Sequence, residues 1–282
     1  FKQKTAYEIM PSLVGSEMCI RDRNRPEKRN SMTTDFWNEF PEIISKINED
    51  GDIRVIILSS TGPHFCSGLD LSLFQSDLLK INQEQQSKPI LLTNYIEILQ
   101  KALNILQDSR IPVIAAIQGA CIGGGLDLVC ASDIRLGTKD CHFSILETKL
   151  GLVADIGTFP RLVKLIPDGL VRELAFTGRN FNSEEAKLSG FLNNVYPNQK
   201  YMLKGAFELA KEISANSPTV VYGCKEAIKF SRDHTTEEGL NWIKMWNSSM
   251  FNMTEIEEAF KAKFEQRLGN FSKLPKKVTK IK

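Results

Sequence analysis

The sequence predicts an α/β fold with a mainly parallel sheet, and this prediction rests on two buried strands and the helices around them. Residues 54–59 (RVIILS) and 112–117 (PVIAAI) are nearly continuous apolar runs, which are typical of strands covered on both faces. Apolar residues recur at helical spacing over residues 33–48 and 90–106. Buried strands that alternate with helices are characteristic of layered α/β proteins, so we expect helices on both faces of the sheet.

The remaining elements divide the chain into a core and a helical tail. Residues 133–136 predict a third strand, and the Gln-rich residues 75–88 predict a surface excursion. Thr33 and Thr34 precede the first helix and can cap it. From residue 197 the pattern is wholly helical, so we expect a core over residues 24–196 and a helical region over residues 197–282. The helices expected in this tail cover residues 201–215, 219–231 and 236–251.

The first 23 residues are expected to be foreign to the rest of the chain. Residues 6–23 (AYEIMPSLVGSEMCIRDR) resemble translated library-adapter sequence, which is set aside in fold reasoning as a cloning scar is. We therefore expect native sequence to begin near Asn24, with the opening strand and any transit peptide missing. The alternative is a genuine amphipathic N-terminal segment.

Composition excludes several classes of function. The 282 residues include 36 Lys and Arg against 34 Asp and Glu, and this balance gives no general case for binding nucleic acid or a membrane. No apolar run approaches the roughly 20 residues of a membrane helix. The cysteines lack CxxC or zinc-like spacing and predict buried thiols in a reducing compartment. None of the three histidines has metal-ligand spacing, so we expect no metal site. The six cysteines are Cys19, Cys66, Cys121, Cys130, Cys141 and Cys224.

Three carboxylates beside a glycine triplet are the candidate catalytic groups. Gly123 to Gly125 precede Asp127, and Glu147 and Asp155 follow, each among apolar neighbours. A carboxylate in such a setting is paired, kept neutral, or held ready to exchange a proton, as a general acid or base must be. Each acid also has a structural interpretation: Asp127 as an early-helix acid, Glu147 as a surface charge and Asp155 as a helix cap.

Two glycine-containing loops are expected to supply an oxyanion hole. Residues 64–70 follow the first apolar strand, and residues 119–125 follow the second and lead into a helix. Opposed amides from Ser67 and Gly124 would stabilise a developing oxyanion by ~3 kcal/mol for each donor. The Ser67 hydroxyl is a poor nucleophile candidate because the GxSxG elbow of serine hydrolases is missing.

The order of these motifs resembles the enoyl-CoA hydratase/isomerase, or crotonase, superfamily. The resemblance implies a spiral of repeated ββα units, a C-terminal helical trimerisation region, and trimers or hexamers. It also implies an acyl-CoA thioester as substrate, with its carbonyl oxygen between the amides of Ser67 and Gly124. The matching segments are NRPEKRNSM (residues 24–32), HFCSGLDL (64–71), IPVIAAIQGACIGGGLDLVCASDIRLG (111–137), Glu147, GLVADIGT (151–158) and FTGRNFNSEEAKLSGFLNNVYP (176–197).

Within this superfamily the acids decide the reaction. The typical hydratase carries glutamates at the positions of Asp127 and Glu147, whereas Asp155 matches isomerases that convert 3,5-dienoyl-CoA into 2,4-dienoyl-CoA during fatty acid β-oxidation. The resemblance implies that Asp155 takes a proton from C2, that Glu147 returns one at C6, and that Asp127 adjusts their electrostatics. The residues expected to contact substrate are Ser67, Gly68, Leu69, Asp70, Leu71, Gly125 and Lys28.

Two other functions stay open at this point. A hydratase of the same fold would add water to a 2-enoyl-CoA, and a non-catalytic crotonase-fold protein would only bind or assemble. The isomerase hypothesis needs no metal or redox cofactor, because CoA is part of the substrate. Family members work in mitochondria or peroxisomes, and no targeting signal can be read in this chain.

Overall fold

The computed structural model describes residues 10–13, 18–70, 72–73 and 88–278, and its centre is a six-stranded, mainly parallel sheet. Only the outermost pair, β1 and β2, is antiparallel. This confirms the predicted α/β class. The strands, in their spatial order, are β1 (Met10–Leu13), β2 (Met18–Arg23), β3 (Val55–Ser60), β4 (Val113–Ile117), β6 (Ile134–Thr138) and β9 (Asn194–Tyr196).

A second, smaller sheet was not expected from the sequence. It has three strands, each too short to show a hydrophobic period, in which β5 and β7 are parallel and β7 and β8 antiparallel. This sheet leads into the glycine triplet, so it positions the candidate site. Its strands are β5 (Ala120–Ile122), β7 (His142–Ser144) and β8 (Phe181–Asn182).

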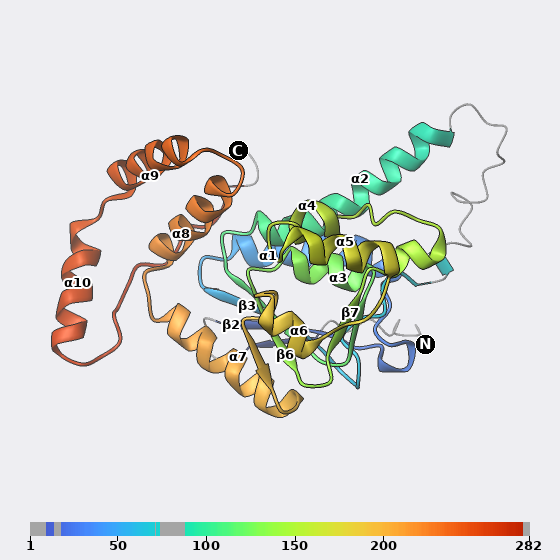
Figure 1. The fold of residues 1–282 in the computed structure, drawn as a ribbon. Helices are drawn as coiled ribbons and strands as arrows, with labels where there is room; N and C mark the ends of the chain where they lie inside the picture. The colour runs from blue at the N-terminus through green and yellow to red at the C-terminus, as the bar shows by residue number, and fades with distance from the viewer. Residues whose placement is uncertain (1–9, 14–17, 71, 74–87, 279–282) are drawn as a thin grey trace, which may run out of the picture.

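Helices cover both faces of the larger sheet, as the apolar strands require (Figure 1). Along β3, Val55 and Ile57 pack towards α7, whereas Ile56 and Leu58 belong to the cluster that contains α1 and α2. Successive side chains of a strand point to opposite faces, so a continuous apolar strand serves two cores. These three helices are α1 (Thr34–Glu49), α2 (Lys88–Gln107) and α7 (Gln199–Ser214).

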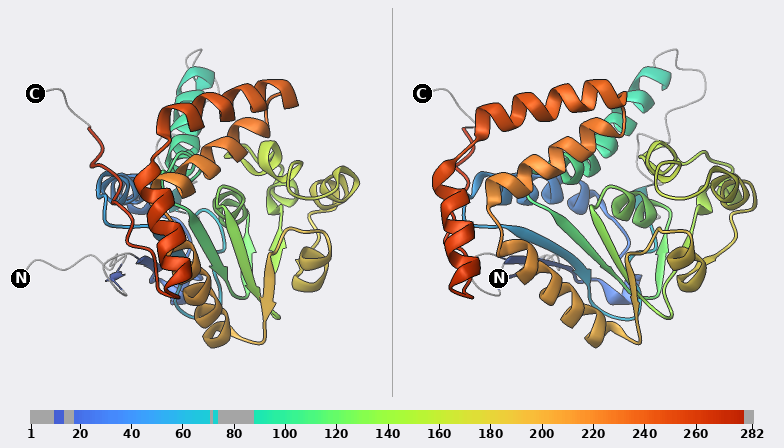
Figure 2. Two further views of the ribbon diagram at one scale, coloured as in Figure 1. Left: turned by 90° about the vertical axis from the view of Figure 1, so that its left-hand side faces the viewer. Right: turned by 60° about the vertical axis from the view of Figure 1, so that its left-hand side comes forward.

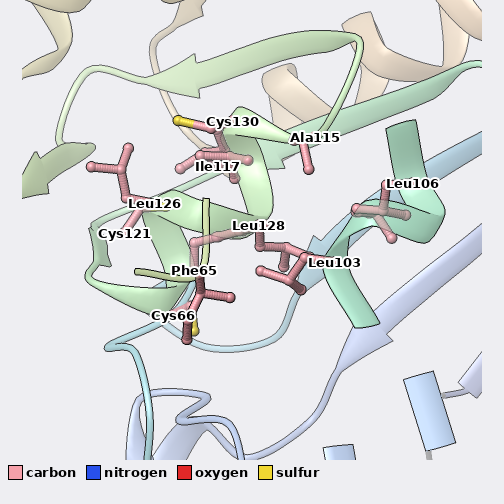
Figure 3. Packing of buried hydrophobic residues seen from close by; sticks show 14 of the residues in the cluster. Phe65, Cys66, Leu103, Leu106, Ala115, Ile117, Cys121, Leu126, Leu128 and Cys130 are labelled. Carbon is pink, nitrogen blue, oxygen red and sulfur yellow. The ribbon is translucent and has the colours of Figure 1, made fainter. Parts of the chain in front are cut away.

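The larger core surrounds α3 (Gly124–Cys130), the short helix that follows the glycine triplet. Leu126 and Leu128 of this helix are buried with Phe65, Leu103 and Ile117 (Figure 3). Close packing of this kind fixes the helix relative to β4 and α2. The start of α3 is therefore a rigid platform.

Several short helices connect the core strands, and two of them, residues 26–28 and 146–150, border the candidate site. Their backbones are tightly turned, and η1 and η3 are 3₁₀ helices. They are η1 (Pro26–Lys28), η3 (Leu146–Leu150), α4 (Thr158–Leu162), α5 (Asp168–Thr177) and α6 (Ser183–Leu188).

The C-terminal region is helical, as predicted, and contains one more helix than expected. In Figures 1 and 2, α9 and α10 extend away from the sheet. Ser217 and Thr235 cap α8 and α9 through their hydroxyl groups, whereas the Thr33 side chain makes no capping bond to α1, contrary to expectation. The helices beyond α7 are α8 (Pro218–Ser231), α9 (Thr236–Met250) and α10 (Met253–Phe264).

Helix α8 is held to the core by a buried lysine. The Lys225 ammonium donates to the carbonyls of Leu106 and Ile111 and lies 2.8 Å from Oδ2 of Asp133. Asp133 also accepts a bond from the Val113 amide, so its carboxyl group contacts both α8 and β4. Replacing one partner of such a pair leaves a buried charge without its counter-charge, so this contact stabilises the attachment of α8 to the core.

Two sequence predictions concern the ends and surface of this fold. The Gln-rich excursion over residues 75–88 falls almost wholly outside the described residues. The foreign origin of residues 1–23 stays a prediction, and the structure pairs Met18–Arg23 in parallel with Val55–Ser60. Within the described part of the chain, no helix combines the length and the apolar character needed to cross a membrane.

Candidate active site

A cavity of about 780 Å³ lies where the two glycine-containing loops meet α2 and η3. Its volume falls within the range of sites for small molecules and cofactors. The first loop contributes Ser67, Gly68, Leu69 and Asp70, and Lys28 and Arg25 stand beside them. The cavity therefore brings together most of the residues that were expected to contact substrate.

The Ser67 amide is not free to bind an oxyanion, so this prediction is wrong. It donates to the carbonyl of Arg29 at 3.0 Å. The next amide, that of Gly68, faces the sulfur of Cys66 at 3.4 Å. Two consecutive amides of the loop are thus committed inside the protein, and the donor must come from a later residue.

Leu69 and Gly124 provide the pair of amides instead. Met32 donates to the carbonyl of Gly68 and accepts from Asp70, both at 2.9 Å, and this pattern turns the Leu69 amide the other way. A Cβ built on Gly124 would lie 3.7 Å from the Leu69 nitrogen, so the two residues are neighbours. Neither amide has a protein acceptor among the described residues.

Glu147 lies beside the glycine triplet. A side chain on Gly123, which has a φ of 53°, would bring its Cβ to 3.0 Å from Oε1 of Glu147. Glycine therefore suits both the backbone and the approach of the carboxyl group. Oε2 of Glu147 is buried and has no hydrogen-bond partner in the described part of the chain. Burial, reinforced by the charge of Asp155 and opposed by the Glu147 amide, raises the pKa of Glu147.

Asp155 reaches the same cavity from the segment between η3 and α4. The residue as a whole is exposed, and its partial burial raises the pKa of its carboxyl group against the effect of its own amide. The Gln100 side chain donates to the Asp155 carbonyl at 2.6 Å and ties this segment to α2. The cavity thus has two carboxyl groups, Glu147 and Asp155, on separate segments.

Asp127 is close to these acids but does not line the cavity. Only 1% of its surface is exposed, and the Thr158 hydroxyl donates to Oδ1 at 2.7 Å. Burial is the largest cause that raises the pKa of Asp127 to about 7; bonds from Thr158 lower it, and the charge of Glu147 adds to the increase. Asp127 can influence Glu147 electrostatically, and it does not touch the space available to a substrate.

The remaining predicted contact residues are Asp70, Gly125 and Leu71, and the structure places each of them differently or leaves it undescribed. Asp70 is held by Arg25, Ser31 and Ser72; burial opposes the shift, but these bonds keep the pKa of its carboxyl well below the usual range. Gly125 lies outside the cavity wall, because it packs against Cys66. Leu71 lies outside the described residues.

An apolar wall from α2 is the part of the site that sequence reasoning missed. Leu92, Tyr95, Ile96 and Leu99 line the cavity. Their spacing of three and four residues predicts one apolar face of a helix. The spacing alone does not say which partner the face meets.

Comparison with known proteins places this geometry in a family. The enoyl-CoA hydratase/isomerase family model matches residues 18–274. The chain belongs to the enoyl-CoA hydratase/isomerase family. Among the described residues of this family member, no three His, Cys, Asp or Glu side chains are arranged to hold a metal ion.

Individual members of the family resemble the chain over most of its length. The mitochondrial Δ3,5-Δ2,4-dienoyl-CoA isomerase of Rattus norvegicus is 41% identical over 89% of this chain and 78% of its own. The peroxisomal Δ3,5-Δ2,4-dienoyl-CoA isomerase of Arabidopsis thaliana is 38% identical over 89% and 91% of the two chains. A solved enoyl-CoA hydratase from Bacillus anthracis superposes with a TM-score of 0.84 at 28% identity, covering 93% of this chain and 98% of its own.

Proposed function

We propose that the protein is a Δ3,5-Δ2,4-dienoyl-CoA isomerase that acts in fatty acid β-oxidation. The observation that carries this proposal is the placement of Asp155 and Glu147 at one cavity, next to the amides of Leu69 and Gly124. Two named isomerases at about 40% identity support the same reaction. Substrate and product are isomers, so the reaction needs no redox cofactor.

The reaction begins with removal of a proton from C2 of a 3,5-dienoyl-CoA. The Asp155 carboxylate takes this proton, and the electrons of the C2–H bond form the new C2–C3 double bond. The C3–C4 and C5–C6 double bonds shift in turn, so that the chain gains a proton at C6 from the Glu147 carboxyl group. The product has double bonds at C2 and C4, conjugated with the thioester.

The amides and the raised pKa values support these roles. Negative charge of the dienolate collects on the thioester oxygen, where two amide donors stabilise it. In this proposal the donors belong to Leu69 and Gly124. Glu147 must be protonated to act as an acid, and its raised pKa favours that form. Asp155 keeps more contact with solvent and so stays ionised more readily than Glu147.

The hydratase alternative is weaker because its two acids do not meet at the cavity. A hydratase would use the positions of Asp127 and Glu147 to hold a water molecule. Asp127 is buried against Thr158 and does not line the cavity. The alternative of a non-catalytic binding protein leaves the arrangement of two cavity acids and two free amides without a role.

A spectroscopic assay tests the proposed reaction. Incubation of the protein with a 3,5-dienoyl-CoA should produce the absorbance of a 2,4-dienoyl-CoA, because conjugation with the thioester changes the ultraviolet spectrum. A 2-enoyl-CoA serves as the comparison substrate. Hydration of the 2-enoyl-CoA with no change in the 3,5-diene would refute the isomerase and support the hydratase.

The same proposal includes a homo-oligomer, a trimer or hexamer, built with the C-terminal helices. Apolar residues face solvent on α9 and α10, with Phe260 and Phe264 72% and 91% exposed. Large apolar patches of this kind mark interaction surfaces. Phe260→Glu with Phe264→Glu should reduce the mass in light scattering to that of one 31.8 kDa chain, whereas Leu188→Glu, at an exposed position of α6, should not. An unchanged mass in the double variant would exclude this surface.

The proposed compartment is a mitochondrion or a peroxisome. The Rattus norvegicus isomerase is named as mitochondrial and the Arabidopsis thaliana isomerase as peroxisomal. The proposed partner in either place is an acyl-CoA, with no nucleic acid and no membrane partner. Lys28, at the cavity, offers a positive charge to the phosphates of CoA.

A further inference from the structure

A second, polar cavity of about 310 Å³ lies between α2, α4 and α8, beside the candidate active site. It shares Asp155 and Ile156 with the larger cavity. Its lining is unevenly charged, with four cations against two acids, Asp155 and Asp233. The cations are Arg161, Lys164, Lys229 and Arg232. The proposed reaction does not use this excess of positive charge.

The two lysines of the polar cavity already have counter-charges. Lys164 forms an ion pair with Asp233. The Lys229 nitrogen lies 3.0 Å from Oδ1 of Asp108 and 3.5 Å from Oε1 of Glu226. The excess of positive charge therefore resides on the two arginines, which come from α4 and from the end of α8.

Arg161 is a buried cation that has only neutral hydrogen-bond partners among the described residues. Just 8% of its surface is exposed. Its guanidinium group donates to Oε1 of Gln107 at 3.0 Å, to the carbonyl of Gly157 at 3.3 Å, and to Oδ1 of Asn104. Neutral acceptors satisfy the donors but leave the charge uncompensated, and a buried charge without a counter-charge is costly.

Arg232 brings a second guanidinium group to the same cavity. It is the exposed C-cap residue of α8, and it takes part in no ion pair within the described part of the chain. Burial lowers the pKa of Arg161, the charge of Arg232 lowers it further, and neighbouring acidic groups oppose this shift. Asp155, the remaining acid of the lining, bonds to neither arginine among the described residues. An anion between the two guanidinium groups would be attracted by both charges.

We propose that the polar cavity binds a small oxyanion of the phosphate class between Arg161 and Arg232. The parallel N–H donors of guanidinium groups match the oxygens of a phosphate. Asn104 and Gln107 accept from Arg161 with their oxygens, so their amide NH2 groups are left as further donors. Since a water molecule occupies roughly 30 Å³ in the liquid, a cavity of about 310 Å³ has room for a small tetrahedral anion and several waters.

The occupant of the polar cavity is a free anion and not a part of an acyl-CoA. The larger cavity, about 780 Å³ with an apolar wall from α2, is the one that suits an acyl chain, and Lys28 stands at that cavity to meet the phosphates of CoA. An anion in the polar cavity would link α2, α4 and α8 and would stabilise the folded protein by mass action. This inference goes beyond the isomerase function and does not depend on it.

Calorimetric titration with inorganic phosphate tests the site. Each titration contains a saturating non-reactive CoA thioester, which keeps phosphate away from the substrate cavity, and sodium chloride holds the ionic strength constant. The variants are Arg232→Gln, at an exposed position, and Arg161→Gln, at the buried one. The matched control is Arg172→Gln, at an exposed position of α5 that lines neither cavity. The circular dichroism spectrum checks that each variant is folded.

The wild type should bind a single phosphate per chain. The dissociation constant should rise at least about tenfold in Arg232→Gln, because a charge-assisted hydrogen bond to the anion is lost. Arg161→Gln should weaken binding in the same way, and Arg232→Gln decides alone if Arg161→Gln does not fold. The control, Arg172→Gln, should bind phosphate as the wild type does.

Three results would overturn the inference. The first is a wild type that shows no saturable binding of phosphate. The second is an unchanged dissociation constant in Arg232→Gln. The third is phosphate that binds only when the CoA thioester is left out, because the anion would then belong to the substrate cavity. Failure to convert a 3,5-diene would instead remove the proposed function and leave this site intact.

Discussion

Asp127 and Asp155 lie on two sides of the same site and experience opposite surroundings. Asp127, on the packed helix α3, is 1% exposed and bonded to Thr158. Asp155, on the segment before α4, is exposed and lines the cavity of the candidate site. Both have raised pKa values, so a raised pKa alone does not identify the residue that meets the substrate. Access to the cavity separates the two roles.

Loss of the Asp155 carboxylate is the largest expected effect. Asp155→Asn should lower the rate of 3,5-dienoyl-CoA isomerisation by about a thousandfold or more, because the amide cannot accept the C2 proton. The absorbance of the 2,4-diene measures this rate. The matched control, Asp140→Asn, changes an exposed acid remote from the cavity and should be as active as the wild type. Normal turnover by Asp155→Asn would show that Asp155 is not the base.

Asp127→Asn should instead change the pH dependence of stability. The pKa of Asp127 rises from 3.8 to about 7 on folding, so the folded protein keeps a proton that the unfolded chain loses between those values. The free energy of unfolding therefore falls as pH rises through this range, by about 4 kcal/mol in total. Asparagine does not ionise, so an Asp127→Asn variant does not lose this free energy of unfolding as pH rises.

Urea unfolding at several pH values measures this difference. Near pH 4 the Asp127→Asn variant and the wild type should be similarly stable, and by pH 8 the variant should be more stable by up to about 4 kcal/mol. Its isomerisation rate should fall less than about tenfold, because the carboxyl group does not line the cavity. A pH-independent difference in stability, or an activity loss as large as that of Asp155→Asn, would contradict the contrast between the two acids.

Thr158→Val gives the smallest expected effect. The substitution keeps the shape of the side chain but removes the hydroxyl that donates to Asp127, and loss of this buried bond should cost about 1–3 kcal/mol of stability. Thr177→Val, at an exposed helix end, is the matched control. Thermal unfolding measures both variants. Equal stability of Thr158→Val and wild type would show that the hydroxyl does not hold the Asp127 carboxyl group.

The class and the larger elements of the fold were predictable because their signals are local. The apolar runs over residues 54–59 and 112–117 correspond to β3 and β4, each shifted by one residue at the start. The second sheet was not predictable, because strands of two or three residues are too short to show a period. Helix α10 was missed because only two residues, 251–252, separate it from α9.

Local sequence patterns predict some features of the candidate site, and contacts between residues distant in sequence decide the others. The three acids and the glycine triplet could be found by their apolar setting, and the structure brings Glu147 and Asp155 to one cavity. Which loop amide is free could not be found this way. The free amide is decided by Arg29, which is distant in sequence. The Arg29 carbonyl accepts a hydrogen bond from the Ser67 amide, and the Leu69 amide is left for a ligand. Similarly, only packing decides that Gly125 meets Cys66 and not the cavity.

The chemical reactivity of the buried Lys225 ammonium depends on whether α8 is packed against the core. Its nitrogen is enclosed by two carbonyls and Asp133, so an amine-reactive reagent cannot reach it while α8 is docked on the core. Lysines on the open surface, such as Lys204 and Lys101, react freely by comparison. The fraction of Lys225 that is labelled, measured by mass spectrometry, would therefore report the fraction of molecules in which α8 has detached from the core.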